Sequence, residues 1–217
     1  TYKLNKKNTI NVGAVYTLGH TLHGDAYKYH QTGTESNGSI YVQSQTGDTI
    51  PNPFKMPHTF GAGLTYVYDN RLTIGVDYTL QKWNTADLAW SKFNKESVEM
   101  NSRTKIAFGA EFVPSYISHN YLKRIRYRMG AYYSSPYNKV SYTSPDTGTT
   151  SFQDGAREYG VSIGFGLPMF QSKSMLNISG QYIKVSPKFK GLMEENYLRI
   201  NIGLTFNERW FMKWKVD

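Results

Sequence analysis

The sequence contains no cysteine and no long apolar run. The first absence excludes disulfide bridges and thiolate metal sites. The second excludes a membrane-spanning helix, because no stretch approaches the roughly 18–20 consecutive apolar residues that such a helix needs. Hydrophobic residues make up only 39% of the 217 residues. That value does not exclude a transmembrane β-barrel, because barrel strands contain only about ten residues each and half of them are polar.

Acidic residues are in the minority, and the formal net charge is +9. The lysines and arginines are scattered along the chain and form no basic helix or stripe, so we expect no nucleic-acid partner. Anionic lipid headgroups or sugar-linked phosphates are a more natural counterpart. Tyrosine and glycine are frequent, with 18 and 19 residues. Such frequencies are typical of a barrel that has tyrosines at the lipid–water boundaries and glycines on a crowded inner wall.

The main pattern is an alternation of apolar and polar residues with a period of two. In the last segment Leu198, Ile200, Ile202, Leu204 and Phe206 point one way, and the residues between them point the other way. The same pattern recurs in about eight segments without an intervening helix. These segments are Asn8–Thr21, Phe60–Val67, Leu72–Trp83, Thr104–Phe112, Ile125–Tyr133, Tyr159–Leu167, Leu176–Tyr182 and Asn196–Phe206.

Charged residues avoid the apolar face in the middle of all eight segments, where a cation at the bilayer midplane would cost about 2–4 kcal/mol. The opposite face holds our lumen-facing candidates, which are Asp77, Trp83, Lys105, Glu111, Arg126, Arg128 and Arg199. Short turns at Asp69–Asn70 and Gln171–Lys173 alternate with long connections, as in outer-membrane barrels. The long connection 23–57 is polar; Ser39–Gln43 could form an extra strand in it.

These patterns predict an all-β fold, a transmembrane antiparallel β-barrel in the bacterial outer membrane, with residues 1–217 forming a single barrel domain. A soluble lipocalin-like barrel or β-sandwich is the alternative, but a lipocalin would have the reverse polarity. We expect an inward ion pair between Glu111 and Arg126 or Arg128, which either shapes a passage or only neutralises charge inside the barrel.

Nothing in the sequence indicates catalysis, so we expect no enzyme, no metal and no cofactor. His20 and His23 are three residues apart, which places their rings on opposite faces of a strand. An outer-membrane hydrolase would be the enzymatic alternative, but no nucleophile elbow is present. In the C-terminal tail, Trp210 and Trp214 alternate with lysine and predict an interfacial anchor or, equally, a docking segment for a partner.

Several segments resemble the FadL-type family of outer-membrane transport proteins. They are Met56–Leu64, Asp77–Trp83, Thr104–Pro114, the strand from Arg128, and Gly203–Phe206. The resemblance implies a barrel of about fourteen strands with an N-terminal plug. The chain would then be the last eight strands, with the plug and early strands outside it. A complete eight-stranded barrel, just wide enough for side chains, is the alternative.

The resemblance also implies a function, which is passive uptake of hydrophobic small molecules such as long-chain fatty acids. The partners would then be outer-membrane lipid, the hydrophobic ligand, and the N-terminal half of the barrel or an associated chain. The alternative is a non-transporting barrel subunit of a larger outer-membrane assembly or export complex, in contact with other barrels.

Overall fold

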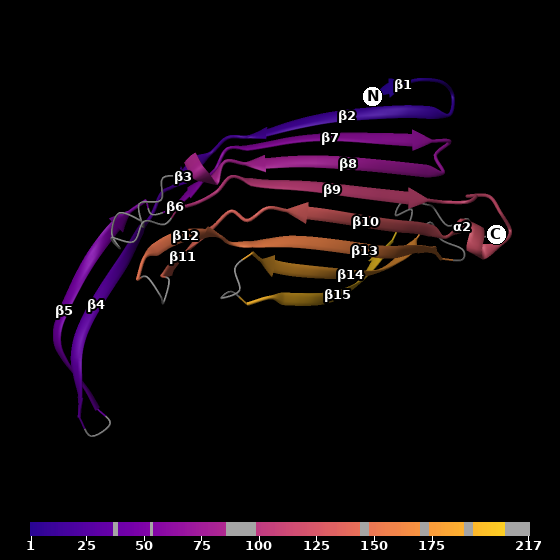
Figure 1. Ribbon diagram of the computed structural model, residues 1–217. Coiled ribbons are helices and arrows are strands. Elements are labelled where there is room, and N and C mark those ends of the chain that lie inside the picture. The colour runs from indigo at the N-terminus through magenta and orange to yellow at the C-terminus, as the bar shows by residue number, and fades with distance from the viewer. Residues whose placement is uncertain are drawn as a thin grey trace, which may run out of the picture.

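A single large antiparallel sheet dominates the computed structural model, which describes residues 1–36, 39–52, 54–85, 99–143, 148–169, 174–188 and 193–206. The sheet has nine strands in the order β1-β2-β7-β8-β9-β10-β13-β14-β15 (Figure 1). Their bounds are β1 Tyr2–Lys3, β2 Asn8–Thr17, β7 Thr59–Tyr68, β8 Leu72–Gln81, β9 Arg103–Phe112, β10 Arg126–Ser134, β13 Ala156–Pro168, β14 Met175–Pro187 and β15 Glu195–Thr205. The all-β, antiparallel prediction is confirmed, and each of the eight alternating segments contributes one strand to this sheet. The first segment was predicted too long, because β2 ends at Thr17 and the segment's last two residues belong to β3 (His20–Leu22) of another sheet.

The turn at Asp69–Asn70 joins β7 to β8 as predicted. Both residues have positive φ angles, 49° and 53°, and the amide of Arg71 donates to the carbonyl of Tyr68 at 2.9 Å. Positive φ at both central positions matches the twist of a hairpin, and Asp and Asn tolerate it well. The second short turn, Gln171–Lys173, lies outside the described residues.

The opposite ends of the strands carry longer, mostly polar connections. A hairpin of β4 (Asp25–Ser36) and β5 (Ser39–Pro51) extends well beyond the sheet in Figure 1, with a register shift between Thr32 and Gly33. The extra strand at Ser39–Gln43 is therefore part of a longer one. Shorter pairs are β3 (His20–Leu22) with β6 (Phe54–Met56) and β11 (Lys139–Thr143) with β12 (Thr150–Asp154).

Helical structure is limited, among the described residues, to the 3₁₀ turn η1 (Trp83–Thr85) and the short helix α2 (Tyr121–Arg124). No described helix is both long and apolar enough to cross a membrane. Without a second layer of helices or strands, the main sheet buries few side chains. The buried apolar residues of the described chain are Ile50, Val113, Ile125 and Ile183.

The closed barrel is not what the structure shows. In the described residues, β15 lies at one edge of an open sheet, and the other edge is formed by β2 with β1 folded against part of it. Closure would require β15 to pair with that opposite edge, but β1 occupies it at Thr9 and Ile10. The described residues therefore do not form a complete eight-stranded barrel by themselves, and that alternative prediction is wrong.

The open sheet predicts the behaviour of the isolated 217-residue chain. Closed membrane barrels migrate differently on gels before and after boiling, because the barrel resists unheated detergent. We expect the chain, refolded alone in detergent, to show no such heat-dependent shift, because two strand edges stay unpaired. A heat-modifiable, protease-resistant species made from Thr1–Asp217 alone would contradict the open sheet.

Candidate functional site

One face of the main sheet is apolar from β2 to β15. Cross-strand pairs connect equivalent positions into continuous rows, because strands in register place paired residues on the same face. One row crosses eight strands and contains Val12, Leu64, Val76, Phe108, Ala131, Val161, Tyr182 and Leu198. We call this surface the apolar face.

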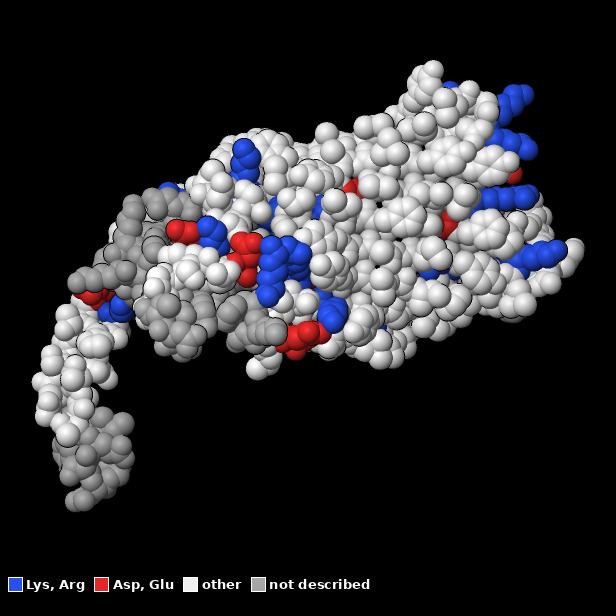
Figure 2. Space-filling model, viewed as in Figure 1, with Lys and Arg blue, Asp and Glu red and all other residues white. Residues whose placement is uncertain are grey.

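The apolar face is exposed rather than covered. Val12 keeps 71% of its surface accessible, Ile163 58% and Leu198 77%. Soluble proteins rarely expose contiguous apolar patches of more than a few hundred Å². In Figure 2 the middle of the visible face carries almost no charge, and Lys and Arg gather toward the two ends of the strands. The face is thus suited to an apolar environment outside the sheet.

Tyrosines lie near both ends of the apolar face. At the end of the sheet that carries the Asp69–Asn70 turn, which we call the turn end, Tyr66, Tyr68 and Tyr127 occupy apolar-face positions. At the opposite, loop end, Tyr133 and Tyr159 pair across β10 and β13 with ring centroids 5.2 Å apart. Two aromatic belts flanking an aliphatic band are typical of a surface that meets lipid–water boundaries on both sides.

Charge reaches the apolar face at the loop end. There Lys184 forms an ion pair with Glu194 at 2.6 Å, and Arg157 occupies an apolar-face position at the start of β13. Both lie at or beyond the tyrosine row. The aliphatic band between the belts stays free of charge in the described strands.

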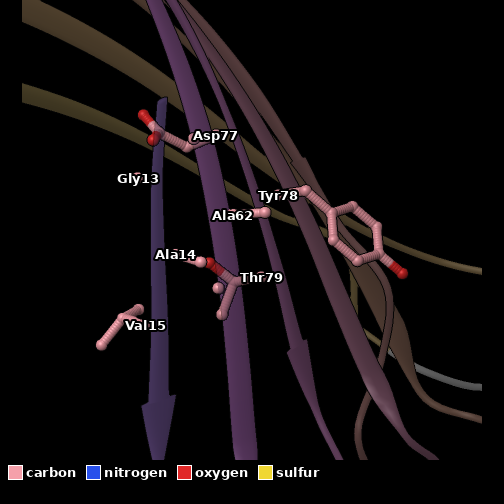
Figure 3. A pocket seen from close by; sticks show the side chains of 9 residues that line it. Gly13, Ala14, Val15, Ala62, Asp77, Tyr78 and Thr79 are labelled. Atoms are coloured by element: carbon pink, nitrogen blue, oxygen red, sulfur yellow. The ribbon is translucent and has the colours of Figure 1, made fainter. Parts of the chain in front are cut away.

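The other face, which we call the polar face, is visible on β8 in Figure 3, where Asp77 and Thr79 point away from the side taken by Tyr78. The hollow drawn there has a volume of about 370 Å³ and is lined by residues of β2, β7 and β8, many of them small, among them Gly13, Gly61 and Gly63. Asp77 extends over Gly63, where an added Cβ would clash with Oδ1 of the carboxylate. Small residues here leave room for the polar side chains of neighbouring strands.

The predicted ion pair is confirmed on the polar face. Glu111 of β9 is paired in register with Arg128 of β10, and its Oε2 accepts from Nε of Arg128 at 2.7 Å. Its Oε1 accepts from Nη1 of Arg126 at 3.3 Å. Arg128 also donates from Nη1 to Oδ1 of Asn177 on β14 at 2.8 Å. The network therefore joins β9, β10 and β14 across the polar face, above the intervening β13.

A second polar cluster lies nearer the loop end. The hydroxyl of Tyr132 donates to Oε1 of Glu158 at 2.5 Å, and Arg103 approaches Oε2 of Glu158 at 3.8 Å. Nε of Arg103 donates to the buried Oγ of Ser134 at 2.7 Å. Lys105 lies with its Nζ 4.7 Å from the centroid of the Tyr132 ring, a cation–π geometry. The residues of this cluster come from three strands, β9, β10 and β13, and their contacts cross-link the polar face.

The remaining candidates are dispersed. Arg199 is paired with Gln181 and lies exposed on edge strand β15. Trp83 is not on a strand: β8 ends at Gln81, and Trp83 begins η1, where its ring packs 5.7 Å from that of Tyr137 and its Nε1 donates to Gln81. Its placement in the third alternating segment was wrong, because the chain turns after Gln81. Trp210 and Trp214 lie outside the described residues.

Sequence reasoning missed Glu158 and Arg103 as members of the polar face. Each lies one residue before the segment assigned to its strand, and extending the period of two by one position would have included both. His20 pairs with Met56 in β3–β6, and the described residues contain no group of three or more possible metal ligands.

The comparison with protein families identifies the chain. The family model of BamG matches residues 1–217. The chain belongs to the BamG family. No curated protein and no solved structure matches it.

Membership in the BamG family corrects the FadL-type resemblance, since BamG is associated with the Bam complex and is not a FadL-type transporter. The family fits a subunit associated with an outer-membrane assembly complex better than it fits a fatty-acid channel. Transport of a hydrophobic ligand and a porin-like pore are thus not supported for this chain. Membership in the family still supports the predicted association with the bacterial outer membrane.

In this BamG-family chain, Glu111 and Arg128 should couple measurably. A double-mutant cycle of Glu111→Gln and Arg128→Gln is expected to give a coupling energy of about 1 kcal/mol, since both side chains are about two-thirds buried. Urea unfolding in detergent measures it. The matched pair Asp69–Arg71, at 3.6 Å and more exposed, should give less than about 0.5 kcal/mol. Equal coupling in both pairs would contradict the network.

Gly160 is required by the position of Tyr132. A Cβ on Gly160 would clash with Cε1 of the Tyr132 ring, so Gly160→Ala is expected to displace the ring from Glu158 and to destabilise the sheet by about 1–3 kcal/mol. Gly109→Ala is the control, because nothing lies within 4 Å of its Cβ position on the same face. If both variants unfold at the same urea concentration, the close packing of Tyr132 on Gly160 is wrong.

Proposed function

We propose that the chain is a non-enzymatic subunit of an outer-membrane protein-assembly complex of the Bam type, in which its main sheet forms part of a membrane-embedded wall. The family membership supports the association with the complex. The apolar face supports the embedding. The proposal assigns neither catalysis nor ligand transport to the chain.

The observation that carries the proposal is the continuous, exposed, charge-free band across eight strands. The strands β2, β7, β8 and β9 have ten residues each, β10 has nine and β15 eleven, whereas β13 and β14 have thirteen each and extend past their neighbours. A tilted transmembrane strand needs about 9–11 residues to cross the hydrocarbon core. The length of the strands, the aliphatic band and the two tyrosine belts therefore agree with one bilayer thickness.

The polar face then faces water or the interior of the assembly. Asp77, Lys105, Glu111, Arg126, Arg128 and Arg199 would all lie on that side. Part of this charge is compensated within the sheet, since Glu111 bonds both Arg126 and Arg128. Such cross-linking holds neighbouring strands together without a second layer and gives the residues a structural role instead of a ligand-binding one.

The two open edges complete the proposal. In a lipid environment each unpaired N–H or C=O group costs several kcal/mol, so the edges of β2 and β15 require further strands to pair with them. These strands would come from the N-terminal half of a longer barrel, as expected above, or from an associated barrel chain. The wall would thus be completed only within a larger barrel or assembly.

A pair of adjacent arginine substitutions tests the embedding. Ile163→Arg places a cation on the apolar face, where the midplane of a bilayer would oppose it by about 2–4 kcal/mol. We expect this variant to be lost from the outer-membrane fraction and from the complex purified through another subunit. Ser162→Arg is the matched control, because Ser162 lines a hollow of about 310 Å³ on the polar face.

The outcomes separate the two parts of the proposal. If both variants insert and co-purify like the wild type, the apolar face does not contact lipid. If Ile163→Arg stays in the membrane but loses the complex, that face is instead covered by a partner protein. If the wild type inserts but never co-purifies with other assembly subunits, the association is wrong and the embedding stands.

A further inference from the structure

The two ends of the sheet differ sharply in charge. At the turn end the described chain carries Lys3, Lys6, Lys7, Arg71, Lys123 and Arg124, against the single carboxylate Asp69. At the loop end cations and carboxylates are mixed and form ion pairs, which are Lys139–Glu99 at 2.6 Å, Lys184–Glu194 at 2.6 Å, Lys188–Asp154 at 3.6 Å and Arg103–Glu158 at 3.8 Å. In Figure 2 the right-hand end of the molecule is tipped with blue.

The cations of the turn end lie on one continuous surface. Asn5 closes the loop after β1 by accepting from the amides of Lys7 and Asn8 at 2.9 and 2.8 Å. The carbonyl of Lys7 then accepts from the amide of Asp69 at 2.7 Å, which joins this loop to the β7–β8 turn. These bonds hold Lys6 and Lys7 beside Arg71.

The same series of bonds continues to α2. The carbonyl of Arg71 accepts from the amide of Val113 at 2.7 Å, and the hydroxyl of Tyr116 donates to the carbonyl of Asn70 at 2.7 Å. The amide of Ser115 donates to the carbonyl of Lys123 at 2.8 Å. The six cations therefore belong to a hydrogen-bonded rim, which we call the basic rim, and five of them are exposed: Lys3, Lys6, Lys7, Arg71 and Lys123.

The basic rim adjoins the tyrosine belt formed by Tyr66, Tyr68 and Tyr127, which ends the aliphatic band. Cations placed immediately beyond an aromatic belt lie at the height of lipid phosphates. Each Lys or Arg near an anionic leaflet contributes about 1 kcal/mol, or roughly a fivefold gain in binding. Phosphates are also the counterpart that a surface with one carboxylate and six cations favours electrostatically.

We propose that the basic rim binds the anionic glycerophospholipid headgroups of the leaflet on the turn side, and so fixes which way up the sheet lies in the membrane. The inference deepens the proposed function and rests on the apolar face meeting lipid. The basic rim supplies the charge for orientation, and the apolar face supplies the driving force for insertion. The mixed charge of the loop end gives that end no comparable preference for anionic headgroups.

Because the sheet has unpaired edges by itself, the test uses the purified assembly complex that contains the chain, and compares its insertion into vesicles of phosphatidylcholine with insertion into vesicles that also contain phosphatidylglycerol. We expect the wild type to favour the anionic vesicles strongly at low salt. The triple variant Lys6→Gln, Lys7→Gln, Lys123→Gln should lose about a hundredfold of that preference. The triple variant Lys55→Gln, Lys82→Gln, Lys188→Gln removes the same charge from the loop end. This variant should retain the preference for anionic vesicles.

A salt titration of the wild type provides a second readout that needs no variant. The screening length falls from about 10 Å at 0.1 M salt to about 3 Å at 1 M, so the preference for anionic vesicles should disappear as salt is added. A preference that survives high salt would overturn the inference. An equal loss in both triple variants would overturn it too, since net charge and not the basic rim would then be responsible.

The remaining outcomes are also decisive. A stronger preference for vesicles with lipopolysaccharide than for phosphatidylglycerol would place the basic rim on the opposite leaflet and contradict the proposal. Unchanged lipid preference in the rim variant, with loss of a co-purifying subunit, would make the basic rim a protein contact. Loss of the wild-type chain from a complex that inserts without it would instead overturn the lipid-facing sheet on which the inference rests.

Discussion

The polarity of the sheet depends on one geometric constraint, the period of two along each strand combined with antiparallel pairing in an unshifted register. From β2 to β15 the described pairs follow one another without a register shift. A slip of one residue in any pair would turn that strand over and move residues such as Glu111 or Arg128 onto the apolar face. The apolar rows, the Glu111 network and the packing of Tyr132 on Gly160 all require the same register.

The sequence alone was sufficient to predict the features that depend on the alternation of apolar and polar residues along each strand. The eight strands, their order along the chain, the apolar face, the Asp69–Asn70 turn and the Glu111 ion pair were all predictable, because each depends on local spacing and on pairing between sequential neighbours. Closure was not predictable, since alternation describes the two faces of a strand and not what pairs with its edges. The β4–β5 hairpin was underestimated because its polar residues lie on both faces and give no amphipathic signal.

The FadL-type resemblance was wrong for a related physical reason. The segments that carried it contain small residues such as Gly61 and Gly63, apolar residues at every second position and an aromatic residue near the strand end. Each of these features follows from a lipid-facing strand with a crowded inner side, whatever its ancestry. Such strand patterns therefore do not distinguish one family from another. The match of the BamG family model over residues 1–217 is what distinguishes the BamG family from the FadL-type family.

The sheet is polarised along two independent directions. Across its thickness the polarity is set by the strands, and in the proposed wall it determines which side faces lipid. Along the strands it is set by the connections: among the described residues, those at the turn end carry mostly cations, whereas those at the loop end carry cations and carboxylates that form ion pairs. Short turns keep their charges at a fixed height, whereas the β4–β5 hairpin reaches beyond the sheet (Figure 1) and is polar enough to meet water and other subunits. A subunit of an assembly complex needs both properties, because its partners can dock correctly only if its side and its orientation are fixed first.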